Sequence, residues 1–161
     1  MEELLAWYRR QARDLPWRRT ADPWAIWVSE VMLQQTRVDT VARYFSPFVE
    51  RFPTPAALAE AGEQEVLAHW AGLGYYRRAR HLHRAAREVV ASHRGQVPDD
   101  PVAFLALPGV GRYTAGAVMS IAFGFPEPVA HGYPELRWAS PAAPELPLPR
   151  LTGKVLEAAL G

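Results

Sequence analysis

A carboxylate and two amides interrupt the most apolar part of the first third of the chain. In SEVMLQQTRVDT, residues 29–40, these are Glu30, Gln34 and Gln35. On a helix, Glu30, Gln34 and Arg37 would fall at i, i+4 and i+7 and share a face. A carboxylate on an otherwise buried helix is poorly solvated, so its pKa is expected to rise, which suits a general acid near neutral pH. The alternative interpretation is a structural ion pair with a neighbouring arginine.

A glycine turn in LPGVGRYTAGAV, residues 107–118, joins two predicted helices. Gly109 and Gly111 allow a tight turn, and a new helix is expected to begin at Arg112. The first amides of a helix have no intrahelical acceptor and lie at the positive end of its dipole, which suits a phosphate. A tight turn that only packs two helices together is the other interpretation.

The basic residues are unevenly placed along a chain whose formal charge is only +1. From Arg77 to Arg94 the sequence holds six arginines and three histidines against one acid, Glu88. Such a block is typical of a phosphate-binding face, although a solvated helix face would have the same composition.

Helices are expected to position the acid, the glycine turn and the basic block. Apolar residues recur at helical spacing through positions 1–125, while strand-like alternation is nearly absent. The sequence therefore predicts an all-α fold, with a helical core over residues 1–125 and a proline-rich tail over residues 126–161. The predicted helices are Glu2–Arg13, Pro23–Gln34, Val38–Arg51, Pro55–Ala61, Glu63–Ala71, Tyr76–His93, Pro101–Ala106 and Arg112–Gly124, with a short one at Leu151–Leu160.

Composition restricts the class of protein further. The 161 residues are 49% apolar, enough for one core, and no apolar run is long enough to cross a membrane. Cysteine is absent, so neither a disulfide nor a thiolate-held metal is expected. The N-terminus lacks the features of a secretory signal, and a cytoplasmic location is the expectation.

Five motifs together resemble the adenine DNA glycosylases, a branch of the endonuclease III-like helix-hairpin-helix superfamily. They are DLPWR, PWAIWVSEVMLQQTRVDTV, RFPTPAALA, GLGYYRRAR and LPGVGRYTAGAV, spread over about residues 7–130. The resemblance implies a base-excision repair enzyme that removes adenine mispaired with 8-oxoguanine or guanine in double-stranded DNA. Tyr113 stands where bifunctional members carry a nucleophilic lysine, so a monofunctional enzyme without strand cleavage is implied.

The resemblance also implies a role for each matching residue. Glu30 would protonate the departing adenine, with Tyr113 near it on the hairpin helix. Residues implied at the lesion or the DNA are Gln34, Gln35, Tyr75, Leu107, Gly109, Gly111, Arg112, Arg77, Arg78 and Arg80. Residues implied at the border of the adenine pocket are Arg13, Trp17 and Arg18, although Trp17 could instead be a core anchor, and Tyr76 could serve only in packing.

The chain departs from the family beyond the hairpin helix. His131 stands where the family has an aspartate that stabilises the cationic sugar, and an imidazole does not supply that fixed negative charge, so catalysis is expected to be impaired. The resemblance also implies a fold that is incomplete on its C-terminal side.

Two family features are expected to be missing from this chain. One is the [4Fe–4S] cluster, for lack of cysteine, so no cofactor is expected; the other is the domain that recognises 8-oxoguanine. The alternatives are a non-catalytic DNA-binding fragment and a segment that is not stable alone. We further expect a monomer, located at the bacterial nucleoid, with exposed apolar surface near Trp27, Val28 and the N-terminal helix.

Overall fold

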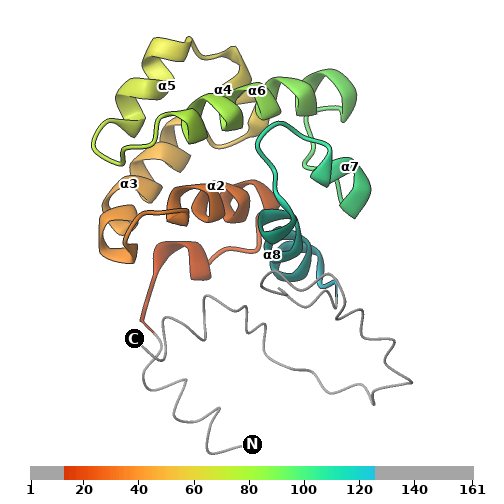
Figure 1. The fold of residues 1–161 in the computed structure, drawn as a ribbon, viewed down its shortest axis with the longest axis horizontal. Helices are drawn as coiled ribbons and strands as arrows, with labels where there is room; N and C mark the ends of the chain where they lie inside the picture. Colours follow the sequence, from red (N-terminus) through yellow and green to blue (C-terminus); the bar gives the residue numbers. More distant parts are fainter. Residues whose placement is uncertain (1–12, 126–161) are drawn as a thin grey trace, which may run out of the picture.

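The computed structural model describes residues 13–125, which form a short 3-10 helix followed by seven α-helices (Figure 1). The elements are η1 (Pro16–Arg18), α2 (Pro23–Leu33), α3 (Val38–Arg51), α4 (Pro55–Glu60), α5 (Glu63–Trp70), α6 (Arg77–Ser92), α7 (Pro101–Leu105) and α8 (Arg112–Phe123). The all-α prediction is confirmed for this part of the chain, and each α-helix lies within one residue of its predicted bounds. The predicted helices Glu2–Arg13 and Leu151–Leu160 fall outside the described residues, apart from Arg13.

Helix α2 is the centre of the fold. Its start follows from the sequence, because Pro23 occupies the first turn and the Asp22 side chain accepts hydrogen bonds from the amides of Trp24 and Ala25. In Figure 1, α4, α5 and α6 lie on one side of α2, η1 lies on the other, and α8 crosses near one end. Every residue of α2 from Trp24 to Met32 is therefore buried.

The end of α2 differs from the expected amphipathic pattern. The helix stops at Leu33, Gln34 adopts an extended conformation, and Gln35 has a φ of 56°. Arg37 is extended and occupies the position before α3, without a capping hydrogen bond from its side chain. The prediction that Glu30, Gln34 and Arg37 share one helix face is therefore wrong, since only Glu30 is helical.

Aromatic packing closes the core around α2. The Trp27 ring lies edge-on to Trp24, with centroids 5.5 Å apart, and to Phe104 of α7, at 4.9 Å. Trp27 and Val28 are both buried. The expectation of exposed apolar surface at these two residues is therefore wrong, and at Trp27 the ring of Phe104 from α7 provides part of the cover. Within the described residues, no helix is long and apolar enough to span a membrane.

Candidate functional site

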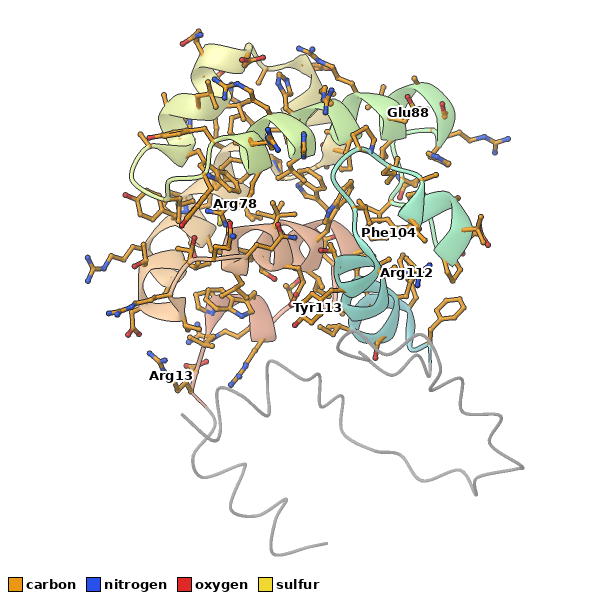
Figure 2. All side chains as sticks on the ribbon, in the orientation of Figure 1. Arg13, Arg78, Glu88, Phe104, Arg112 and Tyr113 are labelled. Atoms are coloured by element: carbon orange, nitrogen blue, oxygen red, sulfur yellow. The ribbon has the colours of Figure 1, made fainter. Side chains whose placement is uncertain are left out.

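Helix α2, which carries Glu30, and the hairpin helix α8 meet near the C-terminal end of α2. Glu30 is 5% exposed and lies in the last turn of α2. Gln34 follows, and its amide nitrogen Nε2 donates to Thr114 Oγ1 of α8 over 2.9 Å. Tyr113, the neighbour of Thr114, is half-buried on α8 (Figure 2). The structure thus brings the helix that carries the predicted acid against the helix that the glycine turn introduces.

The hairpin turn is held closely against α6. Gly109 has a φ of +74°, and a Cβ added there would lie 2.5 Å from the Cβ of His81. Both the conformation and the close approach therefore require glycine. Gly111 precedes α8, and Arg112 begins the helix with an exposed side chain. The predicted start of the helix at Arg112 is confirmed.

Leu107 has a different role from the one expected. Its side chain is buried in the core, which prevents it from reaching DNA without a rearrangement. The prediction of a lesion contact by this side chain is wrong. Leu107 instead anchors the turn, and its carbonyl accepts a hydrogen bond from the Val110 amide over 3.1 Å.

Gln35 and Tyr75 are exposed residues in a conformation that side chains rarely adopt. Gln35 has a φ of 56° and Tyr75 has a φ of 48°. The left-handed region costs free energy for residues other than glycine, and residues of this kind cluster at functional sites. Tyr75 is 59% exposed and Tyr76 is 40% exposed, so Tyr76 is not confined to core packing.

Arg78 does not lie where a phosphate could bind it. It is 8% exposed, and its guanidinium donates to backbone carbonyls near the end of α2 and in the turn before α6. Figure 2 places it between α2 and α6. The prediction that Arg78 contacts DNA is therefore corrected, whereas its neighbours Arg77 and Arg80 are exposed.

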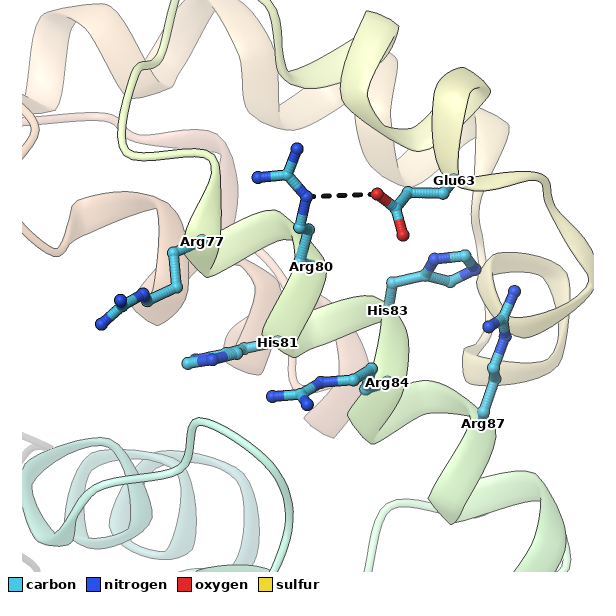
Figure 3. Close-up of a pocket in the computed structure, with 7 residues that line it drawn as sticks. All are labelled: Glu63, Arg77, Arg80, His81, His83, Arg84 and Arg87. Atoms are coloured by element: carbon cyan, nitrogen blue, oxygen red, sulfur yellow. Dashed lines mark hydrogen bonds and ion pairs between the residues drawn. The ribbon is translucent and has the colours of Figure 1, made fainter.

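The outer face of α6 forms a basic groove (Figure 3). The residues that line it are Glu63, Arg77, Arg80, His81, His83, Arg84 and Arg87. Arg80 Nε lies 3.1 Å from Glu63 Oε1, the only acid in the lining. The sequence analysis included His81, Arg84 and Arg87 in the basic block 77–94 but did not single them out as site residues, although their helical spacing from Arg77 was a signal.

The two histidines of the groove both have a pKa below the usual value for histidine. Burial lowers the pKa of His81, and the charges of Arg84 and Arg77 lower it further. Burial also lowers the pKa of His83, whose Nε2 donates to the Ala61 carbonyl over 3.0 Å. The positive charge of the groove near pH 7 therefore comes from its arginines.

Arg13, Trp17 and Arg18 lie near η1. Arg13 is exposed and forms an ion pair with Asp39, and Arg18 Nη1 donates to the Arg13 carbonyl over 2.9 Å. Trp17 is buried edge-on against Phe45, with centroids 5.6 Å apart. Trp17 is thus a core anchor, as its alternative interpretation held. His131, the residue expected in place of the family aspartate, falls outside the described residues.

A cysteine-held iron–sulfur cluster does not fit these 161 residues. The sequence holds no cysteine. Among residues 13–125, moreover, no three His, Asp or Glu side chains gather in an arrangement that could hold a metal.

Known proteins are similar to this chain in sequence and in fold. The sequence is 51% identical to the human adenine DNA glycosylase over 130 residues, which cover 75% of this chain and 24% of the human protein. The fold is similar to that of a thermostable thymine-DNA glycosylase, with a TM-score of 0.70 and 34% identity over 74% of this chain and 56% of the other. It is also similar to an endonuclease III trapped on DNA in an estranged-adenine complex. That similarity has a TM-score of 0.66 and 26% identity, and it covers 76% of this chain and 57% of the endonuclease III chain.

The similarity covers most of this chain but only part of each relative. The chain spans about a quarter of the length of the human relative. Residues 28–144 match the HhH-GPD superfamily of base excision DNA repair proteins, a range that includes the C-terminal half of α2, the hairpin and part of the proline-rich segment. The chain belongs to the HhH-GPD superfamily of base excision DNA repair proteins.

Proposed function

We propose that the chain is a monofunctional DNA glycosylase that hydrolyses the N-glycosidic bond of adenine mispaired with 8-oxoguanine or guanine. The observation that carries the proposal is the buried Glu30 at the end of α2, with Gln34 bonded to Thr114 of the hairpin helix. In the proposed site, Glu30 of α2 supplies the acid and the start of α8 binds a phosphate. The 51% identity to the human adenine DNA glycosylase supports adenine as the base.

The proposed chemistry starts with the proton of Glu30. The protonated carboxyl gives its proton to N7 of the flipped adenine, and the bond between the sugar and the base then breaks with its electron pair moving to the base. Water attacks the resulting oxocarbenium-like sugar and passes a proton to the Glu30 carboxylate, which restores the acid. Tyr113 supplies no amine at the hairpin helix, so no Schiff base forms and the strand stays intact. With His131 in place of an aspartate, the cation lacks a fixed negative partner and the rate is lowered.

We propose that double-stranded DNA binds along the hairpin and the outer face of α6. The amides at the start of α8, next to Gly111 and Arg112, suit a phosphate. Exposed Arg77 and Arg80 would add phosphate contacts. The protein would act as a monomer at the DNA of the bacterial nucleoid, in the cytoplasm.

Gln35 and Tyr75 are the proposed contacts to the lesion. Both side chains are exposed on turns beside the end of α2. When a base is flipped out, an aromatic ring can stack in the space that is left while an amide hydrogen-bonds the edge of the opposite base. Arg13 and Arg18 would border the adenine pocket.

A single-turnover assay tests the role of Glu30. The substrate is a duplex with one adenine opposite 8-oxoguanine, mixed with excess protein. Glu30→Gln removes the acidic proton, and we expect the rate to fall by at least about a hundredfold, as is typical for loss of a general acid. Glu60→Gln, on an exposed residue of α4, is the control and is expected to keep the wild-type rate. Equal rates for wild type and Glu30→Gln would refute the proposed acid.

A non-catalytic DNA-binding module is the second candidate function. It is favoured by the basic groove of α6, which needs no acid to hold phosphates. Salt-sensitive binding of the same duplex without release of adenine, even at long times, would select this candidate over the glycosylase.

A further inference from the structure

Arg78 is a buried cation without a carboxylate partner in the part of the chain that the structure describes. It is 8% exposed, and none of the ion pairs formed among residues 13–125 includes it. It also lies in the first turn of α6, where the dipole of its own helix disfavours a positive charge. Something else must stabilise this guanidinium.

Backbone carbonyls from two separate segments take that role. The Arg78 nitrogen Nη1 donates to the carbonyls of Val31 at 2.9 Å, Met32 at 2.8 Å and Gln34 at 2.5 Å. The other terminal nitrogen, Nη2, donates to Thr36 Oγ1 at 2.9 Å and to the carbonyls of Gly74 at 3.2 Å and Leu73 at 3.4 Å. The three carbonyls that accept from Nη1 lie at the C-terminal end of α2. This is the negative end of the helix dipole, which compensates the buried positive charge.

Aromatic rings complete the surroundings of the guanidinium. Its central carbon lies 5.4 Å from the ring centroid of Trp70 and 5.5 Å from that of Tyr75. Both distances allow cation–π attraction. Burial lowers the pKa of Arg78, yet arginine stays protonated in proteins, so the interaction with both rings persists at neutral pH. The guanidinium of Arg78 thus lies within cation–π distance of the exposed Tyr75 ring and helps to hold it in place.

The two segments that Arg78 joins each carry an exposed residue with a left-handed φ, Gln35 in one and Tyr75 in the other; the third such residue, Arg94, follows the other end of α6. Gln34 and Thr36 flank Gln35, and both accept from Arg78. Gly74 precedes Tyr75 and also accepts. Without such contacts a non-glycine residue would relax out of the left-handed region.

We propose that Arg78 is the positioning residue that fixes Gln35 and Tyr75 relative to each other, so that the turns 34–36 and 73–75 bind the lesion as one unit. Its link to the lesion rests on the proposed function, whereas the coupling of the two turns does not. Lysine could not replace it, because an ammonium places three protons at one point and the six acceptors are spread over two turns.

Hydrogen exchange of the free protein, followed by mass spectrometry, tests the coupling. In Arg78→Lys we expect exchange to rise about tenfold in peptides that cover both turns, because their shared hydrogen bonds are lost. Arg87→Lys, on the exposed face of the same helix, is the matched control and should leave both turns unchanged. A rise in one turn alone, or in neither, would overturn the proposal.

A second variant covers the case in which Arg78→Lys does not fold. Thr36→Val removes a single acceptor from one turn. If Arg78 couples the turns, exchange should also rise around Leu73 and Gly74, although neither residue is changed. Exchange that rises only around Thr36 would contradict the coupling.

Binding to duplexes then tests the link to the lesion. The measured quantity is the ratio of dissociation constants for a matched duplex and a duplex with adenine opposite 8-oxoguanine. We expect Arg78→Lys to reduce this ratio about tenfold while affinity for the matched duplex holds, because the hairpin and the outer face of α6 are unchanged. A wild-type ratio kept in Arg78→Lys would refute the positioning role. No preference in the wild type would instead refute the proposed function, and the exchange result would still decide the coupling.

Discussion

The inner and outer faces of α6 use the same residue type in opposite ways. Arg78 on the inner face is buried and hydrogen-bonded to the backbone of two turns. Arg77 and Arg84 on the outer face are exposed beside the hairpin, where Figure 3 shows them on the same side of the helix as His81. A count of charges along the helix treats all three alike, although one is structural and two are available to a ligand.

The apolar residues of the helix explain which arginine turns inward. Buried Leu82 and Val89 mark the stripe of α6 that faces the core, and Arg78 lies four residues before Leu82 on that stripe. Arg77 and Arg84 lie off it. The position of a charge relative to the apolar stripe is therefore more informative than the local density of charge.

Substitution by methionine should separate the two faces most strongly. Arg78→Met keeps much of the side-chain volume but leaves buried carbonyls without their donor, so we expect the free energy of unfolding to fall by about 3 kcal/mol. Arg77→Met should change it by less than about 0.5 kcal/mol, as is usual at exposed sites. Urea unfolding measures both values, and similar losses for the two variants would break the comparison.

The contact between the hairpin and α6 should be nearly as sensitive. Gly109→Ala places a methyl group against His81 and forces a left-handed conformation on alanine, so we expect a loss of about 2 kcal/mol in the free energy of unfolding. Gly111→Ala is the matched control, since nothing lies within 4 Å of its added Cβ. Thermal or urea unfolding compares them, and a larger loss at Gly111 would contradict the tight packing.

The outer face should control DNA affinity without affecting stability. The double variant Arg77→Gln, Arg84→Gln is expected to reduce the slope of log affinity against log salt by up to about two, since each phosphate contact contributes about 0.9. The double variant Arg43→Gln, Arg51→Gln changes the charge equally on α3 and should keep the slope. Binding titrations between low and physiological salt measure this. Equal slopes in the two double variants would exclude α6 as the DNA-binding face.

The smallest expected effect concerns the pH dependence of stability. Burial lowers the pKa of His83 in the folded state, so the unfolded chain binds the proton more readily. The contribution of neutral His83 is therefore complete above the ordinary histidine pKa of about 6.5 and is lost as the pH falls below it. His83→Gln, whose amide can still donate to Ala61, should flatten the decline in melting temperature between about pH 7 and 5. If the decline in melting temperature is unchanged in His83→Gln, titration of other groups causes it.

The helices were predictable because local signals fix their ends. Capping residues before Pro23, Pro55 and Pro101 begin three of them, and glycines follow others. The turns at the candidate site were not predictable in the same way. Gln35 and Tyr75 adopt left-handed conformations that no local signal specifies, because the contacts to Arg78 come from residues more than forty positions away or from across a turn.

The candidate residues came largely from the family resemblance, and the structure separates those with buried side chains from those with exposed ones. Leu107 and Trp17 are apolar enough to be buried, and their burial depends on neighbours that sequence spacing does not reveal. The Gln34 bond to Thr114 spans eighty positions and likewise required the fold. Sequence motifs thus supplied the candidate residues, while tertiary contacts determine which of their side chains are exposed and which are buried.

Product analysis on one substrate tests the central claim, monofunctional adenine excision, most directly. Excess protein is incubated with a duplex that holds one adenine opposite 8-oxoguanine, and free base and strand length are both measured. The account predicts release of one adenine for each duplex, through Glu30, with the strand intact until alkali cleaves the abasic site. No free adenine, or strand cleavage before alkali, would contradict it.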